Sequence, residues 1–323
     1  MKPRISHQHI PLLATIVVFA LLYAIAAVHF PGFRRPTVFG NFFSDNAFLG
    51  VAAVGVTFVI LSGGIDLSVG AMVGMTSILV AVLIQKHHVS PLLAVAIALA
   101  VGTTLGAGMG ALIRYFKLPP FLVTLAGMFL ARGVGFLISV ESVAIKDPSY
   151  ARLTEWSISV GPLDIPATTM IFVAVLLLGI ALAHGTKFGR NVYALGGDDD
   201  AANLMGLPVG PTRLRIYAFS GFCSALAGVV YTIYSASGNA SAGTGLELDA
   251  IAAVVIGGTL LTGGVGYVAG TLMGVLIFGI IQTFITVQGN LSSWWTKIAV
   301  GVLLLFFVLI QKTLARPAAR TGG

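Results

Sequence analysis

The sequence is poor in charge and nearly devoid of cysteine. Of its 323 residues, 9% are charged and 57% are hydrophobic, whereas a soluble domain carries about 25% charged residues. This shortage excludes an ordinary soluble domain and indicates an integral membrane protein. The single cysteine, Cys223, lies in an apolar stretch, so a disulfide within the chain is excluded.

Motifs of nucleotide binding and of common catalytic sites are also missing. The chain has no G-x-x-x-x-G-K-[ST] sequence, so we do not expect it to bind ATP through a P-loop. HExxH, CxxC and GxSxG do not occur, nor does a paired set of carboxylates in the middle of a helix. We therefore expect a non-catalytic chain that binds no metal or cofactor. The net charge of +7 comes without an aromatic and basic stripe, so nucleic-acid binding is not indicated.

Glycine, by contrast, is abundant and breaks two strongly apolar regions. Residues Thr57–Gly74 read TFVILSGGIDLSVGAMVG, and Ile256–Gly274 read IGGTLLTGGVGYVAGTLMG. Glycine tolerates the positive φ that tight turns often need, so each break is expected to turn the chain back. Asp66 is expected in the first turn of the following helix, where a carboxylate suits the helix dipole. A role for Asp66 as a substrate ligand is the less favoured alternative.

Long apolar runs predict an all-α polytopic membrane protein with ten transmembrane helices in a single domain, residues 1–323. Most Lys and Arg residues fall on the side of the two termini, which predicts that both termini are cytoplasmic. Residues 184–213 are then a cytoplasmic loop and residues 140–165 a periplasmic loop. The ten expected helices are Ile10–Val28, Ala47–Leu61, Ile65–Ile84, Leu92–Ile113, Phe121–Ser139, Ala167–Ala183, Leu214–Tyr234, Leu248–Leu261, Tyr267–Val287 and Lys297–Gln311.

The cytoplasmic loop contains a short capped helix, LGGDDDAANLMGLPV. Asp198 suits the N-cap, Asp199 and Asp200 suit the first turn, and Gly206 suits the position after the last turn. The residues alone leave two readings open, a docking element for a soluble partner and an ordinary loop helix. A metal site is disfavoured because three successive side chains at a helix start point in different directions.

Charged residues inside a membrane are costly and are functional candidates by default. Arg132 falls within the fifth predicted helix, while Glu247 and Asp249 open the eighth on the same side. We expect Arg132 to pair with one of these carboxylates. The alternative is that all three side chains reach the lipid headgroups separately.

Three long runs resemble the permease subunits of bacterial ATP-binding-cassette (ABC) sugar importers of the ribose and galactose class. They are VTFVILSGGIDLSVG (Val56–Gly70), KFGRNVYALGGDDDAANLMGLPV (Lys187–Val209) and ELDAIAAVVIGGTLLTGGVG (Glu247–Gly266). The likeness covers about Asn41 to Gln311. One departure is Asp198, where the family loop usually has Asn, and both residues cap helices.

Within that class, further runs are most similar to one of the two permeases of galactofuranose importers. These are SDNAFLG (Ser44–Gly50), LAGMFLARG (Leu125–Gly133), ANLMG (Ala202–Gly206) and LSSWWTKIAVG (Leu291–Gly301).

The resemblance implies a bacterial inner-membrane protein that forms half of a pore with a second, similar permease. A cytoplasmic ABC ATPase would bind ATP and Mg²⁺, and a periplasmic sugar-binding protein would deliver the substrate. The short helix would be the coupling helix that docks on the ATPase. The residues implied in coupling are Asp198, Asp199, Asp200, Ala201, Ala202, Asn203, Leu204, Met205 and Gly206.

A sugar path needs groups that pair with hydroxyls and an aromatic face. Residues of suitable type and depth are Asn46, Phe48, Phe121, Thr124, Phe129, Gln282 and Thr283. The rival reading is a stand-alone carrier driven by an ion gradient. Such a carrier is expected to hold a coupling carboxylate near the middle of the membrane, whereas Asp66, Glu247 and Asp249 are all placed at helix ends.

Overall fold

The computed structural model describes residues 10–289, 292 and 294–314. Residues 1–9 and 315–323, which are predicted to be cytoplasmic, lie outside this described part. In chain order the elements are α1 (Ile10–His29), η2 (Pro31–Arg34), α2 (Pro36–Asp45), α3 (Ala47–Leu61), α4 (Val69–Gln85), α5 (Pro91–Tyr115), α6 (Pro120–Ile138), β1 (Val143–Ala144), α7 (Pro148–Glu155), β2 (Ser157–Val160), β3 (Leu163–Pro166), α8 (Ala167–Gly185), α9 (Lys187–Gly197), α10 (Asp199–Leu204), α11 (Val209–Ser235), β4 (Ser237–Gly238), α12 (Leu246–Ile256), α13 (Val268–Gln288) and α14 (Trp294–Leu314).

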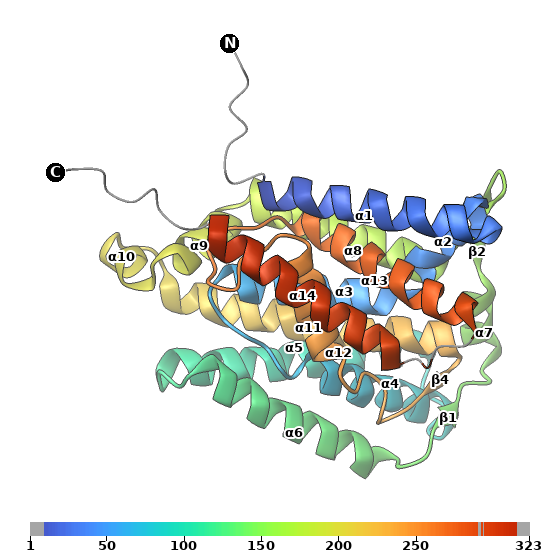
Figure 1. Cartoon of the computed structure of the whole chain (residues 1–323). Helices are drawn as coiled ribbons and strands as arrows, with labels where there is room; N and C mark the ends of the chain where they lie inside the picture. The colour runs from blue at the N-terminus through green and yellow to red at the C-terminus, as the bar shows by residue number, and fades with distance from the viewer. Residues whose placement is uncertain (1–9, 290–291, 293, 315–323) are drawn as a thin grey trace.

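The long helices run side by side, and the short elements gather at the two ends of the molecule (Figure 1). Helices α9 and α10 form one end, which we call the α10 end, and α7 with the strands forms the other, the α7 end. The strands make two small antiparallel pairs, β1 with β4 and β2 with β3. The start of α1 and the finish of α14 both lie at the α10 end (Figure 1).

Each of the ten predicted stretches contains a helix, but the helices differ in length. Five of them, α5, α6, α8, α11 and α13, are long and apolar enough to cross a membrane, and α2 with α3 makes a sixth candidate bent by 56°. Helix α12 has 11 residues, or about 16 Å at 1.5 Å per residue. It ends at Ile256, five residues before the predicted end at Leu261.

Helix α11 lies at the centre and packs against α3, α4 and α5. Gly102, Gly106 and Gly110, spaced four residues apart on α5, face α11 at close range. A Cβ on Gly102 would meet Gly221 O at 2.8 Å, and one on Gly110 would meet the Leu214 Cα at 3.0 Å. Removing side chains from this face lets the two backbones approach each other.

The two glycine breaks share one pattern, 200 residues apart. Ser62–Gly74 reads SGGIDLSVGAMVG and Thr262–Gly274 reads TGGVGYVAGTLMG, with glycine at the second, third, ninth and thirteenth positions of both. The two regions also touch, because Gly264 N donates to Leu61 O at 2.9 Å and the hydroxyls of Thr57 and Thr271 lie 2.8 Å apart. The breaks thus join two short helices, α3 and α12, at one place.

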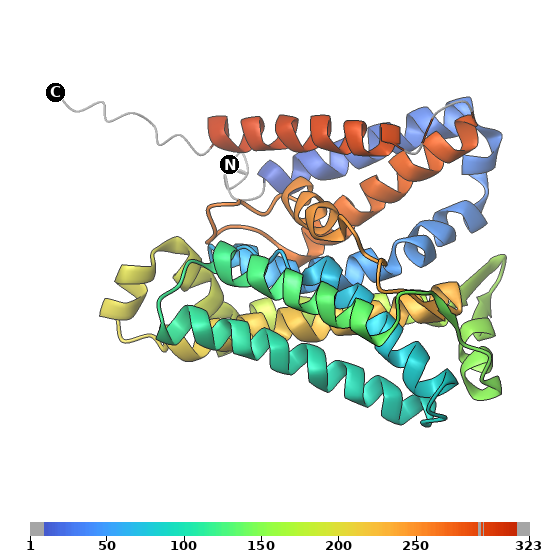
Figure 2. The ribbon, with the colours of Figure 1, turned by 90° about the horizontal axis from the view of Figure 1, so that it is seen from below.

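The small-residue segment Ser237–Gly245, which connects α11 to α12, runs along α4. Its first residues contact Ser77 near the middle of α4, its middle residues contact Gly74, and Gly243 contacts Gly70 in the first turn of α4. Helix α12 therefore begins where α4 begins. Figure 2 shows α12 between a group with α1, α13 and α14 and a group with α4, α5, α6 and α11.

We expect Gly106→Ala to destabilise the protein relative to Gly108→Ala. A Cβ at Gly106 would collide with Tyr217 O, whereas nothing lies within 4 Å of one at Gly108. Both changes gain the same helix propensity, so the difference isolates overpacking of about 1–3 kcal/mol. The apparent melting temperature in detergent should differ by about 3 °C or more. Equal melting temperatures would contradict the close contact of α5 and α11.

Candidate functional site

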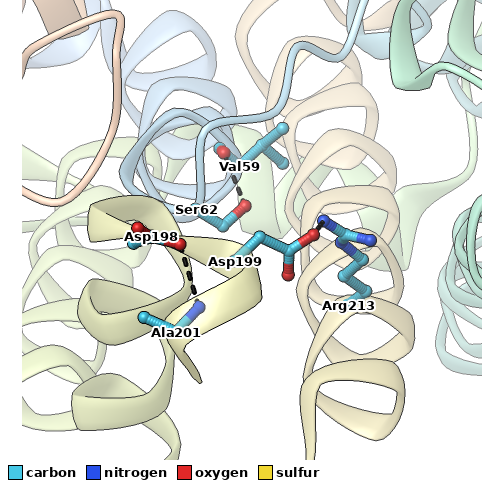
Figure 3. A network of polar contacts seen from close by, with 6 residues as sticks. All are labelled: Val59, Ser62, Asp198, Asp199, Ala201 and Arg213. Carbon is cyan, nitrogen blue, oxygen red and sulfur yellow. Dashed lines mark hydrogen bonds and ion pairs between the residues drawn. The ribbon is translucent and has the colours of Figure 1, made fainter. Parts of the chain in front are cut away.

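Helices α9 and α10 form a compact unit that projects from the α10 end (Figure 1). Asp198 Oδ1 accepts from Ala201 N at 2.9 Å, which caps α10 (Figure 3). Gly206 follows the last turn with φ of +75°, and its N–H donates to Asn203 O at 3.0 Å. The predicted cap and the predicted glycine stop are confirmed, although the helix ends at Leu204 and Met205 is its C-cap.

An ion pair fixes this unit to the membrane helices. The Arg213 guanidinium donates to Asp199 Oδ2, which joins α10 to the start of α11 (Figure 3). Ala202 is buried, while Leu204 and Met205 are 88% and 70% exposed. Helix α10 is therefore held by the ion pair and by burial of Ala202, and its C-terminal end presents two large apolar side chains at the surface.

The C-terminal end of α9 rests on both glycine breaks. A Cβ on Gly196 would meet Leu61 O and Gly264 N, and one on Gly263 would lie 2.7 Å from Gly63 N. Gly63, Gly263 and Gly264 all have positive φ, between +74° and +84°, which favours glycine. We call the meeting of Gly63, Gly196, Gly263 and Gly264 the glycine junction.

Tyr193 of α9 adds a side-chain bond beside the glycine junction. Its hydroxyl donates to Gly266 O at 2.8 Å. Burial raises the pKa of Tyr193 to about 12, so the hydroxyl stays protonated and keeps donating at neutral pH. Helix α9 is thus bonded to the second glycine break as well as packed on it.

Asp66 does not stand in the first turn of α4, because that helix begins at Val69. Asp66 is 1% exposed, and its Oδ1 accepts from Ser68 N at 2.9 Å and from Ser68 Oγ at 2.6 Å. This local turn competes with the helix and delays its start. Its Oδ2 accepts from Ser220 Oγ of α11 at 2.7 Å. The carboxylate is therefore used to hold the first glycine break against α11.

Among the described residues Arg132 makes no direct ion pair with Glu247 or Asp249, although Glu247 is near enough for the two charges to attract. Its Nη1 donates to the carbonyl oxygens of Ala240 and Ala242 at 2.6 and 3.0 Å. Asp249 is paired with Lys297, whose Nζ lies 2.5 and 2.7 Å from the carboxylate oxygens. Segment Ser237–Gly245 lacks a helix's internal bonds, and carbonyls at membrane depth need partners. A guanidinium with five donors supplies them.

Glu247 lies at the start of α12 beside the first turn of α4. Its Oε2 is buried and, among the described residues, accepts no hydrogen bond. The same oxygen occupies the space where Gly70 would carry a Cβ. The negative charge is therefore close to two helix N-termini, which are favourable places for a carboxylate.

A cavity of about 510 Å³ lies between the α2–α3 junction, segment Ser237–Gly245 and helices α12, α13 and α14. We call it the polar pocket. Three predicted path residues line it, and they are Asn46, Phe48 and Gln282. Sequence reasoning did not place the pocket's other polar and aromatic residues on the sugar path, and these are Asp45, Tyr231, Thr244, Asp249, Phe278, Thr286, Trp294, Thr296 and Lys297.

The remaining predicted path residues do not line this pocket. Phe121 and Phe129 lie on α6 and are 48% and 67% exposed. Thr124 is buried and donates to Pro120 O at 2.9 Å, a bond within its own helix. Thr283 follows Gln282 on α13 but is not part of the lining. The structure therefore separates the α6 candidates from those on α3 and α13.

Known proteins similar to this chain agree on one class. Residues 38–308 match the family model described as branched-chain amino acid transport system / permease component. The inner membrane ABC transporter permease protein YjfF of Escherichia coli (strain K12) is 52% identical over 309 residues, 95% of this chain and 93% of the relative.

Two further relatives have names that include a substrate. The fructose import permease protein FruG of Bifidobacterium longum is 37% identical, over 96% of this chain and 92% of its own length. The ribose import permease protein RbsC of Escherichia coli (strain K12) is 37% identical, over 92% of each chain. No solved structure matches the chain.

The chain belongs to this permease family. The permease is a non-catalytic membrane component of an ABC transporter of the inner membrane. The family prediction made from the three long motifs is therefore confirmed at the level of the ABC permease.

We expect Asp198→Ala to loosen α10, because it removes the bond to Ala201 N. Loss of an N-cap costs about 1 kcal/mol, so the amides of residues 199–205 should exchange hydrogen for deuterium about five times faster. Asp198→Asn is the matched control, since Asn also caps helices. Equal exchange in the Ala and Asn variants would show that the cap does not hold α10.

We expect Arg132→Met to release segment Ser237–Gly245 from α6. The probe is a cysteine placed at Ala242, which is 9% exposed, and the native Cys223 is fully buried. Removing the guanidinium leaves two carbonyls without a donor, so labelling of this cysteine by a maleimide should speed up at least tenfold. Arg114→Met in the same background is the control. Unchanged labelling after Arg132→Met would show that Arg132 does not hold segment Ser237–Gly245 in place.

Proposed function

We propose that this permease forms half of the transmembrane path of an ATP-driven monosaccharide importer, paired with a second permease. The observation that carries this proposal is the similarity, over 92% of the chain or more, to permeases named for fructose and ribose import. The family description names branched-chain amino acids instead. The polar pocket favours a sugar, because its carboxylates, amides and hydroxyls suit a ligand with many hydroxyl groups.

The proposal includes ten crossings with both termini in the cytoplasm. Helices α2 and α3 would make one bent crossing, and segment Ser237–Gly245 with α12 would make another. Two features support this topology: α1 starts and α14 finishes at the α10 end, and most Lys and Arg residues fall on the same side. Galactofuranose, the finer substrate prediction, rests on the four sequence runs quoted above.

Helix α10 would be the coupling helix, docked on a cytoplasmic ATPase that binds ATP and Mg²⁺. The exposed Leu204 and Met205 suit an apolar groove on such a partner. The Asp199–Arg213 ion pair and the glycine junction would make α9 and α10 move with α3, α11 and α12. A periplasmic sugar-binding protein would deliver the substrate at the α7 end.

The rival function is a stand-alone carrier driven by an ion gradient. Glu247, with its buried and unbonded Oε2, is the described carboxylate that fits such a role best. Asp66 and Asp249 fit it less well, because hydroxyl groups and Lys297 already pair with them.

Purification from the native membrane in mild detergent distinguishes the two functions. We expect an ABC ATPase and a second, similar permease to accompany the chain in stoichiometric amounts. The reconstituted complex should then take up sugar only with ATP and a binding protein. A chain that purifies alone and moves sugar under an ion gradient without ATP would overturn the importer proposal.

We expect Leu204→Glu to abolish co-purification of the ATPase without unfolding the permease. Leu204 is 88% exposed, so a charge there costs the fold little but opposes docking on an apolar groove. Val160→Glu, at an exposed position of β2 at the opposite end, is the control. ATPase recovery equal to that of the wild type for Leu204→Glu would rule out α10 as the docking helix.

A further inference from the structure

We propose that the polar pocket binds the transported monosaccharide and that the Asp249–Lys297 ion pair is the centre that recognises its hydroxyl groups. This inference rests on the proposed import function and adds to it a site within the permease itself. Both side chains line the cavity, one from α12 and the other from α14.

The ion pair retains bonding capacity for a ligand. Lys297 Nζ contacts both carboxylate oxygens, at 2.5 and 2.7 Å, and the two side chains remain 49% and 19% exposed. An ionised carboxylate has about four acceptor positions and an ammonium has three donors. A sugar hydroxyl both donates and accepts, so two neighbouring hydroxyls can bond to the carboxylate and the ammonium together.

The lining of the pocket also includes amide groups. Asn46 donates its amide N–H to Phe42 O at 3.1 Å, which fixes the orientation of its side chain at the α2–α3 junction. Gln282 faces the same cavity from α13. Amides that donate and accept in fixed positions discriminate between hydroxyl patterns, because an unpaired polar group in the bound state is costly.

Aromatic rings complete the pocket. Phe48 and Tyr231 pack edge to face with their ring centroids 5.7 Å apart, and Trp294 lines the cavity from the first turn of α14. Apolar ring faces next to a few fixed polar groups are typical of small-molecule sites, whose volumes are roughly 300–1,000 Å³. The polar pocket falls within that range.

A second cavity shows the contrast. It has a volume of about 890 Å³ and lies between α4, α5 and α6, but Thr104 is its sole hydroxyl-bearing lining residue and no charged residue lines it. That cavity suits a lipid chain and offers little to a sugar. Among these two large cavities, the chemistry for hydroxyl groups is concentrated in the polar pocket.

The test uses the complete transporter in proteoliposomes, with labelled D-ribose, D-fructose and D-galactose as probes. The variants are Asp249→Asn, Lys297→Met, the neutral double variant with both changes, and Gln282→Ala. Glu141→Gln, an exposed position at the α7 end, is the matched control. Basal ATP hydrolysis and co-purification of the ATPase report whether each variant is assembled.

We expect the KM for uptake of the transported sugar to rise about tenfold or more in the three ion-pair variants and less in Gln282→Ala. The neutral double variant separates the two possible roles of the pair. It leaves no uncompensated charge, so uptake should return to normal if the pair acts only in folding. Contacts to the sugar, however, would still be missing. A wild-type KM in the assembled double variant would overturn the proposal.

Deoxy sugars give a second, independent readout. Removing the hydroxyl that bonds to the ion pair should weaken competition for the wild type about tenfold and leave the double variant unaffected. Equal losses in both proteins for every deoxy sugar would place the hydroxyl contacts elsewhere and contradict the site.

The pocket and the import function fail in different ways. If the wild type shows ATP-driven uptake and all pocket variants match it, the pocket proposal falls alone. If the wild type shows no ATP-driven uptake of any probe, the import function falls. Fluorescence of a purified permease that carries Trp156→Phe and Trp295→Phe, and so keeps Trp294 alone, then still tests the pocket. A fluorescence change that saturates with a probe sugar when Asp249 is present, and is absent in Asp249→Asn, would support the site. The absence of any change with Asp249 present would overturn it.

Discussion

The fold depends on backbone-to-backbone contact at the glycine junction. Three segments far apart in the chain meet there, and the space around Gly196 is filled by Leu61 O and the Gly264 N–H. No side chain fits between them, which explains why each segment carries glycine. The positive φ of Gly63, Gly263 and Gly264 is a second reason, because side-chain-bearing residues rarely adopt it. The contact lies at the end of α3 and holds the loop that carries α10 against both glycine breaks.

Where a helix breaks inside a membrane, its backbone N–H and C=O groups need other hydrogen-bond partners. Several polar side chains of this protein supply them. Arg132 supplies donors to the carbonyls of Ala240 and Ala242. At the finish of α12, Thr15 donates to Ile256 O at 2.6 Å and Gln311 to Val255 O at 3.1 Å. Arg132 and Gln311, one charged and one amide side chain, thus serve to satisfy backbone carbonyls.

Helix α12 connects the two parts of the proposed mechanism. The second glycine break follows its last residue and leads to the glycine junction, while Asp249 in its first turn faces the polar pocket. Because the helix is only 11 residues long, a shift of the junction would be felt at Asp249 as a movement relative to Lys297 on α14. The ATPase-facing loop and the sugar pocket would then be linked by one short rigid element, a form of coupling used in domain closure.

Local patterns in the sequence determined the helix-rich class, the position of a helix in each apolar stretch, the cap of α10 by Asp198 and the glycine face of α5. Each of these depends on neighbours within a few residues or on helical periodicity. Tertiary structure alone decided that Asp66 bonds to Ser220, that Arg132 bonds to carbonyls, and that Lys297 joins Asp249 in a pocket. It also placed Ser237–Gly245 along α4. The physical reason is that these partners come from segments far apart in the chain, 154 residues for Asp66 and Ser220 and 162 for Ser77 and Asn239. A residue's type states which bonds it can make but not which distant group will be beside it.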